Sequence, residues 1–306
     1  MSIPHDHHFI PAFYLTQWAV TDDELVEYCI KQHKLIAKPV GPRATGYVRD
    51  LYAFPEFPPE HHAQHLEAKF FNYADNVAAQ ALAMHLSGQS NAALWTSELV
   101  SGWSRFVMGV HLRHPDVLPE LKAGAGTAWD KSGDTYQKHY EQVRTADHPP
   151  TMDEWIATVD PLTRAKVQLN AVMKMIDNEE VGACLKKMRH AVVDLSGSPF
   201  QLVTSDRPVQ LYRINQPDGL VAMPISPTKL FVGAHRLATF DRLRATKPKV
   251  LVQNFNKFVL SRARKFVWAS DRSQIHFVEK YMSKALEPTP FFPTLGNYLG
   301  GETAAA

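Results

Sequence analysis

The residues best suited to chemistry lie at the start of the chain, where His5, Asp6, His7 and His8 precede an aromatic and apolar run. Imidazole changes its charge near neutral pH and binds metals, so such a cluster can supply acid–base or metal chemistry. If the segment is extended, side chains alternate, and His5 and His7 face one side while Asp6 and His8 face the other. A metal held by these histidines would therefore need a ligand from elsewhere in the chain.

Asp206 is the most suitable additional ligand, because it lies in a turn between two segments that have the pattern of strands. Zinc and similar ions take two imidazoles and a carboxylate, so the sequence offers a divalent metal site at His7, His8 and Asp206. Asp206 could equally act as a general base. The structural alternatives are imidazoles bonded to the backbone near a strand start, and Ser205 and Asp206 serving as turn formers.

Four further residues are candidates for holding a substrate. Arg113 ends a mostly apolar predicted helix, where its planar guanidinium could clamp a carboxylate or phosphate, or could instead cap the helix C-terminus. Asn256 is an amide on a mainly apolar predicted helix and needs a polar partner. Ser205 in the turn could donate a hydrogen bond, and we place Tyr14 with Ser205 and Asn256 as substrate-binding candidates.

A second group of histidines lies at the start of a predicted helix. His61 and His65 are four residues apart and share a helix face, a separation that helical zinc ligands use. His62 stands where the general base of that motif would be Glu, so the motif is incomplete. A solvated helix start with acids in its first turn is the better interpretation.

Composition indicates an ordinary globular protein. Of the 306 residues, 45% are hydrophobic and 21% are charged, which excludes the disordered and fibrous classes.

No leader-like or membrane-spanning apolar run is visible, so we expect a cytoplasmic protein without membrane contacts. Cys29 and Cys184 are too few and too distant for a disulfide framework or a thiolate zinc site, and we expect both to be reduced. The oligomeric state cannot be derived from the sequence.

The charge of +2 conceals an asymmetry along the chain. Residues 229–272 hold eleven Lys or Arg residues and two acidic residues, an excess of nine positive charges, so the remainder is acidic. Such a region could attract a phosphate, a nucleotide or nucleic acid through its field. The alternative is a solvated helix face.

The pattern of apolar residues predicts an α+β fold in one domain, with a mainly antiparallel sheet built from N- and C-terminal strands and a large all-helical insertion. N-terminal strands occupy 1–58, the helical block 59–189, the C-terminal sheet and a long helix 190–285, and a loosely ordered tail 286–306. The expected strands are 24–30, 35–40, 190–195, 200–204, 209–214, 220–223 and 229–233. The expected helices include one at 92–112, one interrupted at Gly124–Gly126, and others at 152–158, 161–177, 179–189 and 247–269.

Several separated motifs fit one template: residues 7–15, 106–115, 202–209 and 223–227, with the helix around Asn254, Asn256 and Ala263. Together they resemble a widespread, mainly bacterial family known as domain of unknown function 4238. The resemblance spans nearly the whole chain. It implies no reaction, so the chemistry must come from the residues themselves.

Two classes of function follow. The leading hypothesis is a hydrolase of a phosphorylated or nucleotide-like substrate, with His7 and His8 providing acid–base or metal chemistry, Asp206 orienting or ligating, and Arg113 holding the anion. Its partner would be a small anionic substrate. The alternative is a non-enzymatic binding or toxin-like defence protein that recognises nucleic acid or a protein through the basic C-terminal region.

Overall fold

The computed structural model describes residues 5–19, 23–54, 57, 71–88 and 92–282, and these form an α+β fold with antiparallel sheets. The smallest sheet pairs β1 (Asp6–His8) with β4 (Tyr47–Arg49). After β1 come the short helices α1 (Ala12–Leu15) and η1 (Thr16–Trp18), and η2 (Pro42–Ala44) precedes β4. The fold class predicted from the sequence is confirmed, with the strands distributed over separate sheets.

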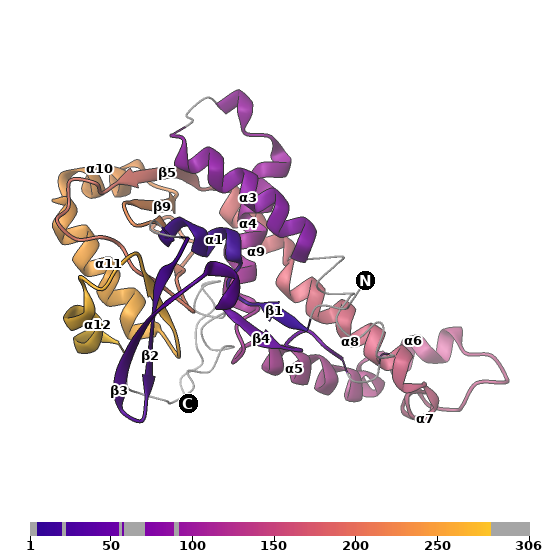
Figure 1. The fold of residues 1–306 in the computed structure, drawn as a ribbon. Helices are drawn as coiled ribbons and strands as arrows, with labels where there is room; N and C mark the ends of the chain where they lie inside the picture. Colours follow the sequence, from indigo (N-terminus) through magenta and orange to yellow (C-terminus); the bar gives the residue numbers. More distant parts are fainter. Residues whose placement is uncertain (1–4, 20–22, 55–56, 58–70, 89–91, 283–306) are drawn as a thin grey trace, which may run out of the picture.

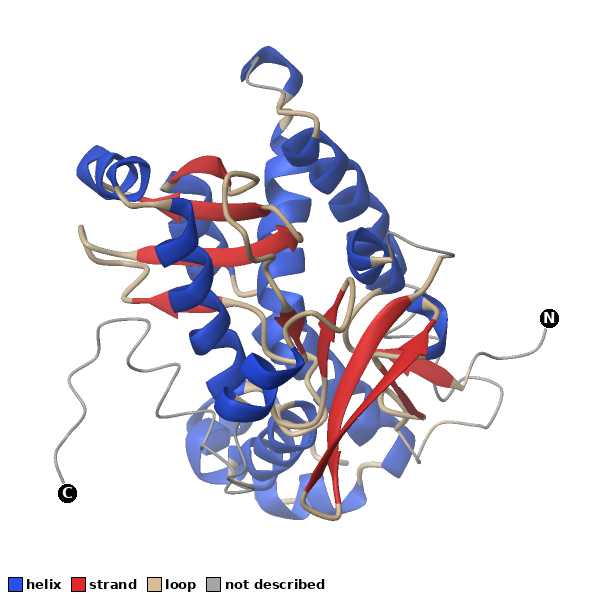
Figure 2. Cartoon of the chain, turned by 60° about the vertical axis from the view of Figure 1, so that its left-hand side comes forward, coloured by secondary structure: helices blue, strands red, loops and turns tan. Residues whose placement is uncertain are grey.

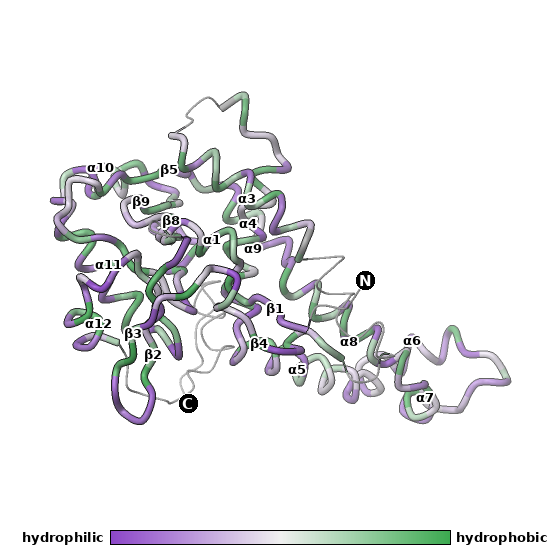
Figure 3. The backbone as a smooth tube through the Cα atoms, in the orientation of Figure 1, coloured by the Kyte–Doolittle hydropathy of each residue, from purple (hydrophilic) through white to green (hydrophobic). Residues whose placement is uncertain are grey.

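A second sheet joins the two ends of the chain. Its order is β3 (Lys34–Val40), β2 (Leu25–Lys31), β10 (Val267–Ala269) and β6 (Thr204–Ser205). Gln32 and His33, the two residues between β2 and β3, both have positive φ, which is the conformation of a tight hairpin turn. The tip of this hairpin, at the lower end of its strands in Figure 3, is hydrophilic, and the strands that lead to it carry apolar residues. The predicted hairpin is confirmed, and it pairs with β10, which lies in a segment expected to be helical, while the strands expected at 190–195, 209–214, 220–223 and 229–233 form a separate sheet.

The third sheet separates two cores. Its order is β5 (Arg189–Asp194), β9 (Lys229–Ala234), β8 (Leu220–Ser226) and β7 (Gln210–Tyr212). Successive side chains of β9 point to opposite faces, so Phe231 packs with Trp103 in one core, while Leu230 and Val232 pack with Val252 in the other. Helices lie on both sides of these strands (Figure 2). Burial of both faces explains why the central strands β8 and β9 are almost continuously apolar.

The helical block lies between the N-terminal segment and β5. Its members are α3 (Asn72–Leu86), η4 (Ala92–Leu94), α4 (Ser97–Leu112), α5 (Leu118–Asp130), α6 (Ser132–Val143), α7 (Met152–Thr158), α8 (Pro161–Ile176) and α9 (Glu179–Lys187). Helices α3 and α4 approach so closely at Gly102 that a Cβ there would collide with Val77. Helices α6 and α7 project as an arm from the rest of the molecule (Figure 1).

The basic C-terminal region forms an outer layer of helices. It consists of α10 (Leu237–Ala245), α11 (Pro248–Arg262) and α12 (Ile275–Tyr281), which lie on the far side of the third sheet from α4 (Figure 1). The apolar stripe of α11, with Val252, Phe255 and Val259, enters the second core. Its charged residues are left at the outside of the layer.

Several predicted boundaries are wrong. Gly124 and Gly126 do not interrupt α5, because Leu121 and Ala125 are buried on its inner face and their packing holds the helix together. The helix expected over 247–269 ends at Arg262. The last residues of that range form β10, where the sequence predicts a continuation of the helix. The expected strand 200–204 is reduced to β6. His61, His65 and the tail 286–306 lie outside the described residues.

In the described part of the chain, no helix combines the length and the apolar character that crossing a membrane requires.

Candidate functional site

His7 and His8 lie side by side on β1 and face opposite ways. His7 is fully buried, its Nδ1 accepts a hydrogen bond from the backbone N–H of Tyr52 at 2.9 Å, and its ring stacks on the Tyr52 ring with centroids 4.9 Å apart. His8 is half-buried beside Tyr47, and its carbonyl accepts a hydrogen bond from the Tyr52 hydroxyl. The alternation expected of a strand therefore places the two imidazoles in separate surroundings.

Arg113 sits beside His8 and is committed to a carboxylate of the protein itself. Its Nη1 and Nη2 donate to the two oxygens of Asp75 at 3.0 Å each, and the guanidinium lies over the Phe71 ring. Arg113 is 1% exposed, so a ligand has no direct approach to it. The pKa of His8 is lowered, first by burial, with the positive charge of Arg113 adding to it and a hydrogen bond to the Arg43 backbone opposing it.

Asp206 is buried, and three backbone amides hold its carboxylate. The N–H groups of Arg264, Lys265 and Phe266 donate to it at 2.9, 2.6 and 2.9 Å. Burial raises the pKa of Asp206, and these three hydrogen bonds oppose that rise. Next to it, Ser205 Oγ accepts a hydrogen bond from the Arg207 amide. Both side chains therefore fix the loop between α11 and β10 and the turn that faces it.

The predicted metal site at His7, His8 and Asp206 does not form. These three residues are all described, and in the described ranges no three His, Cys, Asp or Glu side chains gather closely enough to hold a metal ion. The physical reasons are the strand alternation that separates the histidines and the three amides that hold the Asp206 carboxylate.

Tyr14 and Asn256, two of the predicted substrate-binding residues, make their hydrogen bonds within the protein. The Tyr14 hydroxyl is buried, donates to the Pro224 carbonyl and shares a hydrogen bond with Thr204 Oγ1, both at 2.7 Å. Asn256 accepts from the Val203 amide and donates to the Gln201 carbonyl. Each residue ties the chain near β6 to its surroundings, and the structure does not place them in a common site.

The predicted motifs do converge, through neighbouring residues that the sequence did not single out. Arg207 follows Asp206, Asp116 follows the His114–Pro115 step, and Arg264 follows α11. Arg207 Nη2 and Arg264 Nε each donate to the same oxygen of Asp116 at 3.1 Å. The Asp116 side chain is 43% exposed, and those of Arg207 and Arg264 are 13% and 16% exposed. We call Arg207, Arg262, Arg264 and Asp116 the arginine cluster.

Two histidines beneath the arginine cluster are kept neutral. Burial, with the charge of Arg262 next in size, lowers the pKa of His111 to about 3. Burial, with the charge of Arg207 next in size, lowers the pKa of His114 to about 3, and Asp116 opposes the shift. The His114 ring meets the edge of Phe9, the residue after His8, at 5.8 Å between centroids. Three sequence motifs thus meet at one place.

The charge at the arginine cluster favours an anion. Arg207 and Arg264 contact the exposed Asp116 carboxylate, and the charge of Arg262 acts on Arg207, while Asp206 is buried and bonded to amides. Arg262 lies over the Phe258 ring, and its Nε is buried without a hydrogen-bond partner in the described ranges. Asp206 and Arg207 lie in the bend after β6, where no periodicity in the sequence indicates which way a side chain faces.

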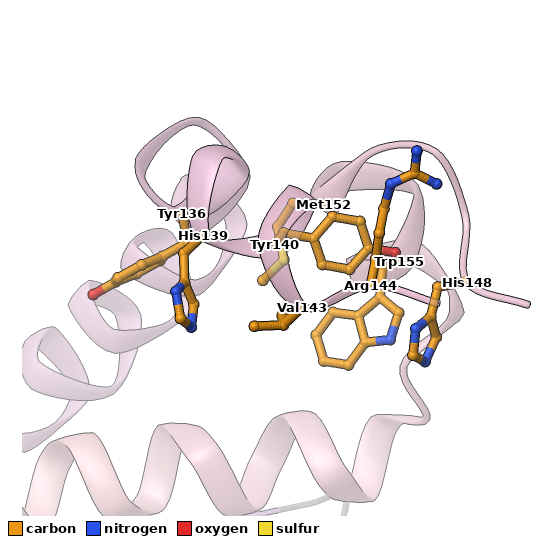
Figure 4. A pocket seen from close by; sticks show the side chains of 8 residues that line it. All are labelled: Tyr136, His139, Tyr140, Val143, Arg144, His148, Met152 and Trp155. Carbon is orange, nitrogen blue, oxygen red and sulfur yellow. The ribbon is translucent and has the colours of Figure 1, made fainter. Parts of the chain in front are cut away.

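A separate hollow lies on the arm formed by α6 and α7. It measures about 300 Å³, and its lining is mainly aromatic and apolar. Figure 4 shows Tyr140 and Trp155 near each other, with Tyr136 and His139 across from them and Val143 between. Tyr136 and Val143 are exposed. None of the residues predicted to be functional contributes to this hollow, so it does not form part of the candidate site.

Comparison with known proteins identifies a family and no activity. A family model described as "Protein of unknown function (DUF4238)" matches residues 6–273, which is most of the chain. No curated protein and no solved structure matches the sequence.

Proposed function

The chain belongs to the DUF4238 family, whose description names no reaction, and we propose from the geometry that it binds a phosphate-bearing ligand at the arginine cluster. The observation that carries this proposal is the convergence of Arg207 and Arg264 on one oxygen of Asp116. Guanidinium groups arranged around an exposed oxyanion have the geometry that suits a phosphate.

Asp116 supports the proposal because it holds the arginines in place without a ligand. An unpaired pair of guanidinium groups would repel each other, and the Asp116 carboxylate offsets that repulsion. Arg207 donates one side-chain hydrogen bond in the described structure, to Asp116, and so retains donors for a ligand. The phosphate would add to the arginines beside Asp116 or displace its carboxylate.

The basic outer helices would extend this attraction. The region 229–272, with its excess of nine positive charges, includes Arg262 and Arg264 of the arginine cluster and all of α10 and α11. A field of that sign raises the local concentration of anions and speeds their encounter with the protein. The shared chemistry is a phosphate mono- or diester, from a small nucleotide or from a nucleic-acid strand.

Binding is supported better than hydrolysis. The residues assigned to hydrolysis, His7, His8, Asp206 and Arg113, either make internal hydrogen bonds or are shielded, and they do not face one cavity. Hydrolysis needs a base with an open approach to substrate, whereas binding needs donors at the surface. The hydrolase hypothesis stays a prediction from the sequence.

The test is a binding measurement with Arg207→Gln and Arg264→Gln. Calorimetry or fluorescence anisotropy would be run with pyrophosphate, a nucleoside triphosphate and a short single-stranded DNA. We expect the wild type to bind at least one probe and each variant to weaken that binding about tenfold or more. Arg164→Gln is the matched control, since Arg164 pairs with Asp130 at the surface of α8. Equal affinities for all four proteins would refute the proposal.

A further inference from the structure

A second cavity lies in the outer layer, between α11, α12 and the chain before β6. It measures about 200 Å³, and its lining includes Phe200, Gln253, Asn256, Gln274 and Phe277. Two phenyl rings and three carboxamides therefore line one small space. We call this cavity the amide pocket.

The amides of this pocket are partly fixed and partly available. Asn256 Nδ2 donates to Gln201 O at 2.8 Å and to Gln274 Oε1 at 3.1 Å, which uses both of its protons. Gln274 Nε2 also donates to Gln201 O, so one N–H and one lone pair of its amide remain. The side chain of Gln253 has no hydrogen-bond partner among the described residues. The fixed network orients Gln274, and the remaining donors and acceptors can meet a ligand.

Two lysines of α11, which we call the rim lysines, lie near the amide pocket without lining it: one is over the ring of the lining residue Phe200, and the other is over Tyr281, which packs on the lining residue Phe277. Lys249 Nζ lies 5.6 Å from the centre of the Phe200 ring, and Lys257 Nζ lies 5.2 Å from the centre of the Tyr281 ring. Lys249, Gln253 and Lys257 follow one another at intervals of four residues and so share a helix face. A cation thus stands on either side of the carboxamides along α11.

We propose that the amide pocket binds the base of a nucleoside phosphate. Phenyl rings stack on any planar base, and carboxamides offer the paired donor and acceptor that the polar edge of a base requires. A volume of about 200 Å³ suits one ring system better than a large ligand. The rim lysines meet the phosphate, as point charges that need no fixed geometry.

The amide pocket is distinct from the arginine cluster and stands without it. Arg262 lies over Phe258, whereas Asn256 contacts Gln274 of the α12 side, so the two sites use different faces of α11. A nucleotide in the amide pocket and a phosphate on the arginine cluster would therefore be bound separately.

The test is the affinity of the full-length protein for AMP and UMP, with adenosine and uridine as uncharged counterparts. We expect at least one nucleotide to bind, and Phe200→Ala and Gln253→Leu each to weaken that binding about tenfold. Lys249→Gln should weaken the nucleotide several-fold and leave the nucleoside unchanged. Saturation-transfer NMR should show contact between the base protons and the protein in the wild type and its loss in Phe200→Ala.

The controls separate this proposal from the proposed function. Asn254→Leu changes an exposed amide at the next position of α11 and should leave affinity unchanged. Binding that Arg207→Gln abolishes and Gln253→Leu leaves intact would place the nucleotide on the arginine cluster and overturn this inference. Failure of the wild type to bind either nucleotide would also overturn it, whatever happens with pyrophosphate.

Discussion

Arg207 and Asp116 lie 91 residues apart in the chain, and their side chains meet at 3.1 Å on the surface of the molecule. The Asp116 carboxylate competes there with any incoming anion. Removing its charge should therefore strengthen phosphate binding, whereas removing an arginine should weaken it. Asp116→Asn should increase affinity for the phosphate probe several-fold, because it removes one negative charge beside two guanidinium groups. Isothermal calorimetry on the purified variant measures the change.

The same variant should be little less stable than the wild type. Asp116 is 43% exposed, and exposed ion pairs contribute about 0–1 kcal/mol each. A large loss of stability in urea would mean that Asp116 is mainly structural. Weaker phosphate binding in a folded Asp116→Asn protein would contradict the role assigned to it.

Asp206→Asn tests whether the buried carboxylate positions Arg264. Three backbone amides now donate to the two oxygens of the Asp206 carboxylate, whereas an Asn side chain has one oxygen. At least one buried amide would lose its acceptor, so we expect a loss of about 3 kcal/mol in the free energy of unfolding. Hydrogen exchange at the amides of Arg264, Lys265 and Phe266 should accelerate, and phosphate affinity should fall. Ser205→Ala is the control, because it removes one hydrogen bond and should cost about 1 kcal/mol.

Asp75→Asn tests the structural role of Arg113. The substitution leaves the buried guanidinium without the carboxylate that it contacts twice, so unfolding free energy should fall by about 3 kcal/mol. Asp130→Asn breaks the exposed pair with Arg164 and should cost less than about 1 kcal/mol. Similar losses in urea denaturation for the two variants would show that burial of Arg113 contributes little.

Stability should fall as the solution becomes acidic below the ordinary histidine pKa. Burial lowers the pKa of His85, His111 and His114 to about 3, from the unfolded value of 6.5. Between these values the unfolded chain binds more protons than the folded one, so stability rises with pH and is lost as pH falls. Each histidine contributes about 1.4 kcal/mol per pH unit in that window.

Urea denaturation at several pH values between about 7 and 4 measures this slope. His114→Asn should make the slope of stability against pH shallower by one proton, if the variant folds. A stability that is independent of pH over this range would contradict the neutral, buried state of these rings.

The sequence predicts the elements with a clear apolar pattern and fails where packing or register decides. The β2–β3 hairpin and strands β5, β7, β8 and β9 are identified by short apolar runs bounded by turn residues, although β8 and β9 are buried on both faces and do not alternate. The sequence does not predict α10 and α12, which begin without a side-chain N-cap, whereas α7 and α9 have the same lengths and begin at capping residues. In α5, propensity favoured a break at the glycines, but the burial of Leu121 overrides it.

The sequence predicts Asp206 as a site residue, whereas the arginine cluster contains the next residue, Arg207. Asp206 and Arg113 belong to the motifs that meet, yet each points inward and has an internal partner. Arg207 follows Asp206 in the bend after β6, and its side chain is partly exposed where it meets Asp116. Asp116 lies in a loop, where no periodicity indicates which way a side chain faces, so its meeting with Arg264 follows from tertiary structure alone.

The salt dependence of binding tests most directly whether Arg207 binds phosphate. A labelled single-stranded DNA and a nucleoside triphosphate would be titrated against wild type and Arg207→Gln between about 50 and 200 mM salt. We predict that wild-type affinity falls steeply with salt, and that Arg207→Gln binds more weakly, with a log–log slope about 0.7–0.9 shallower for the strand. Equal affinity and equal slope for the two proteins, or no binding of either probe by the wild type, would contradict the account.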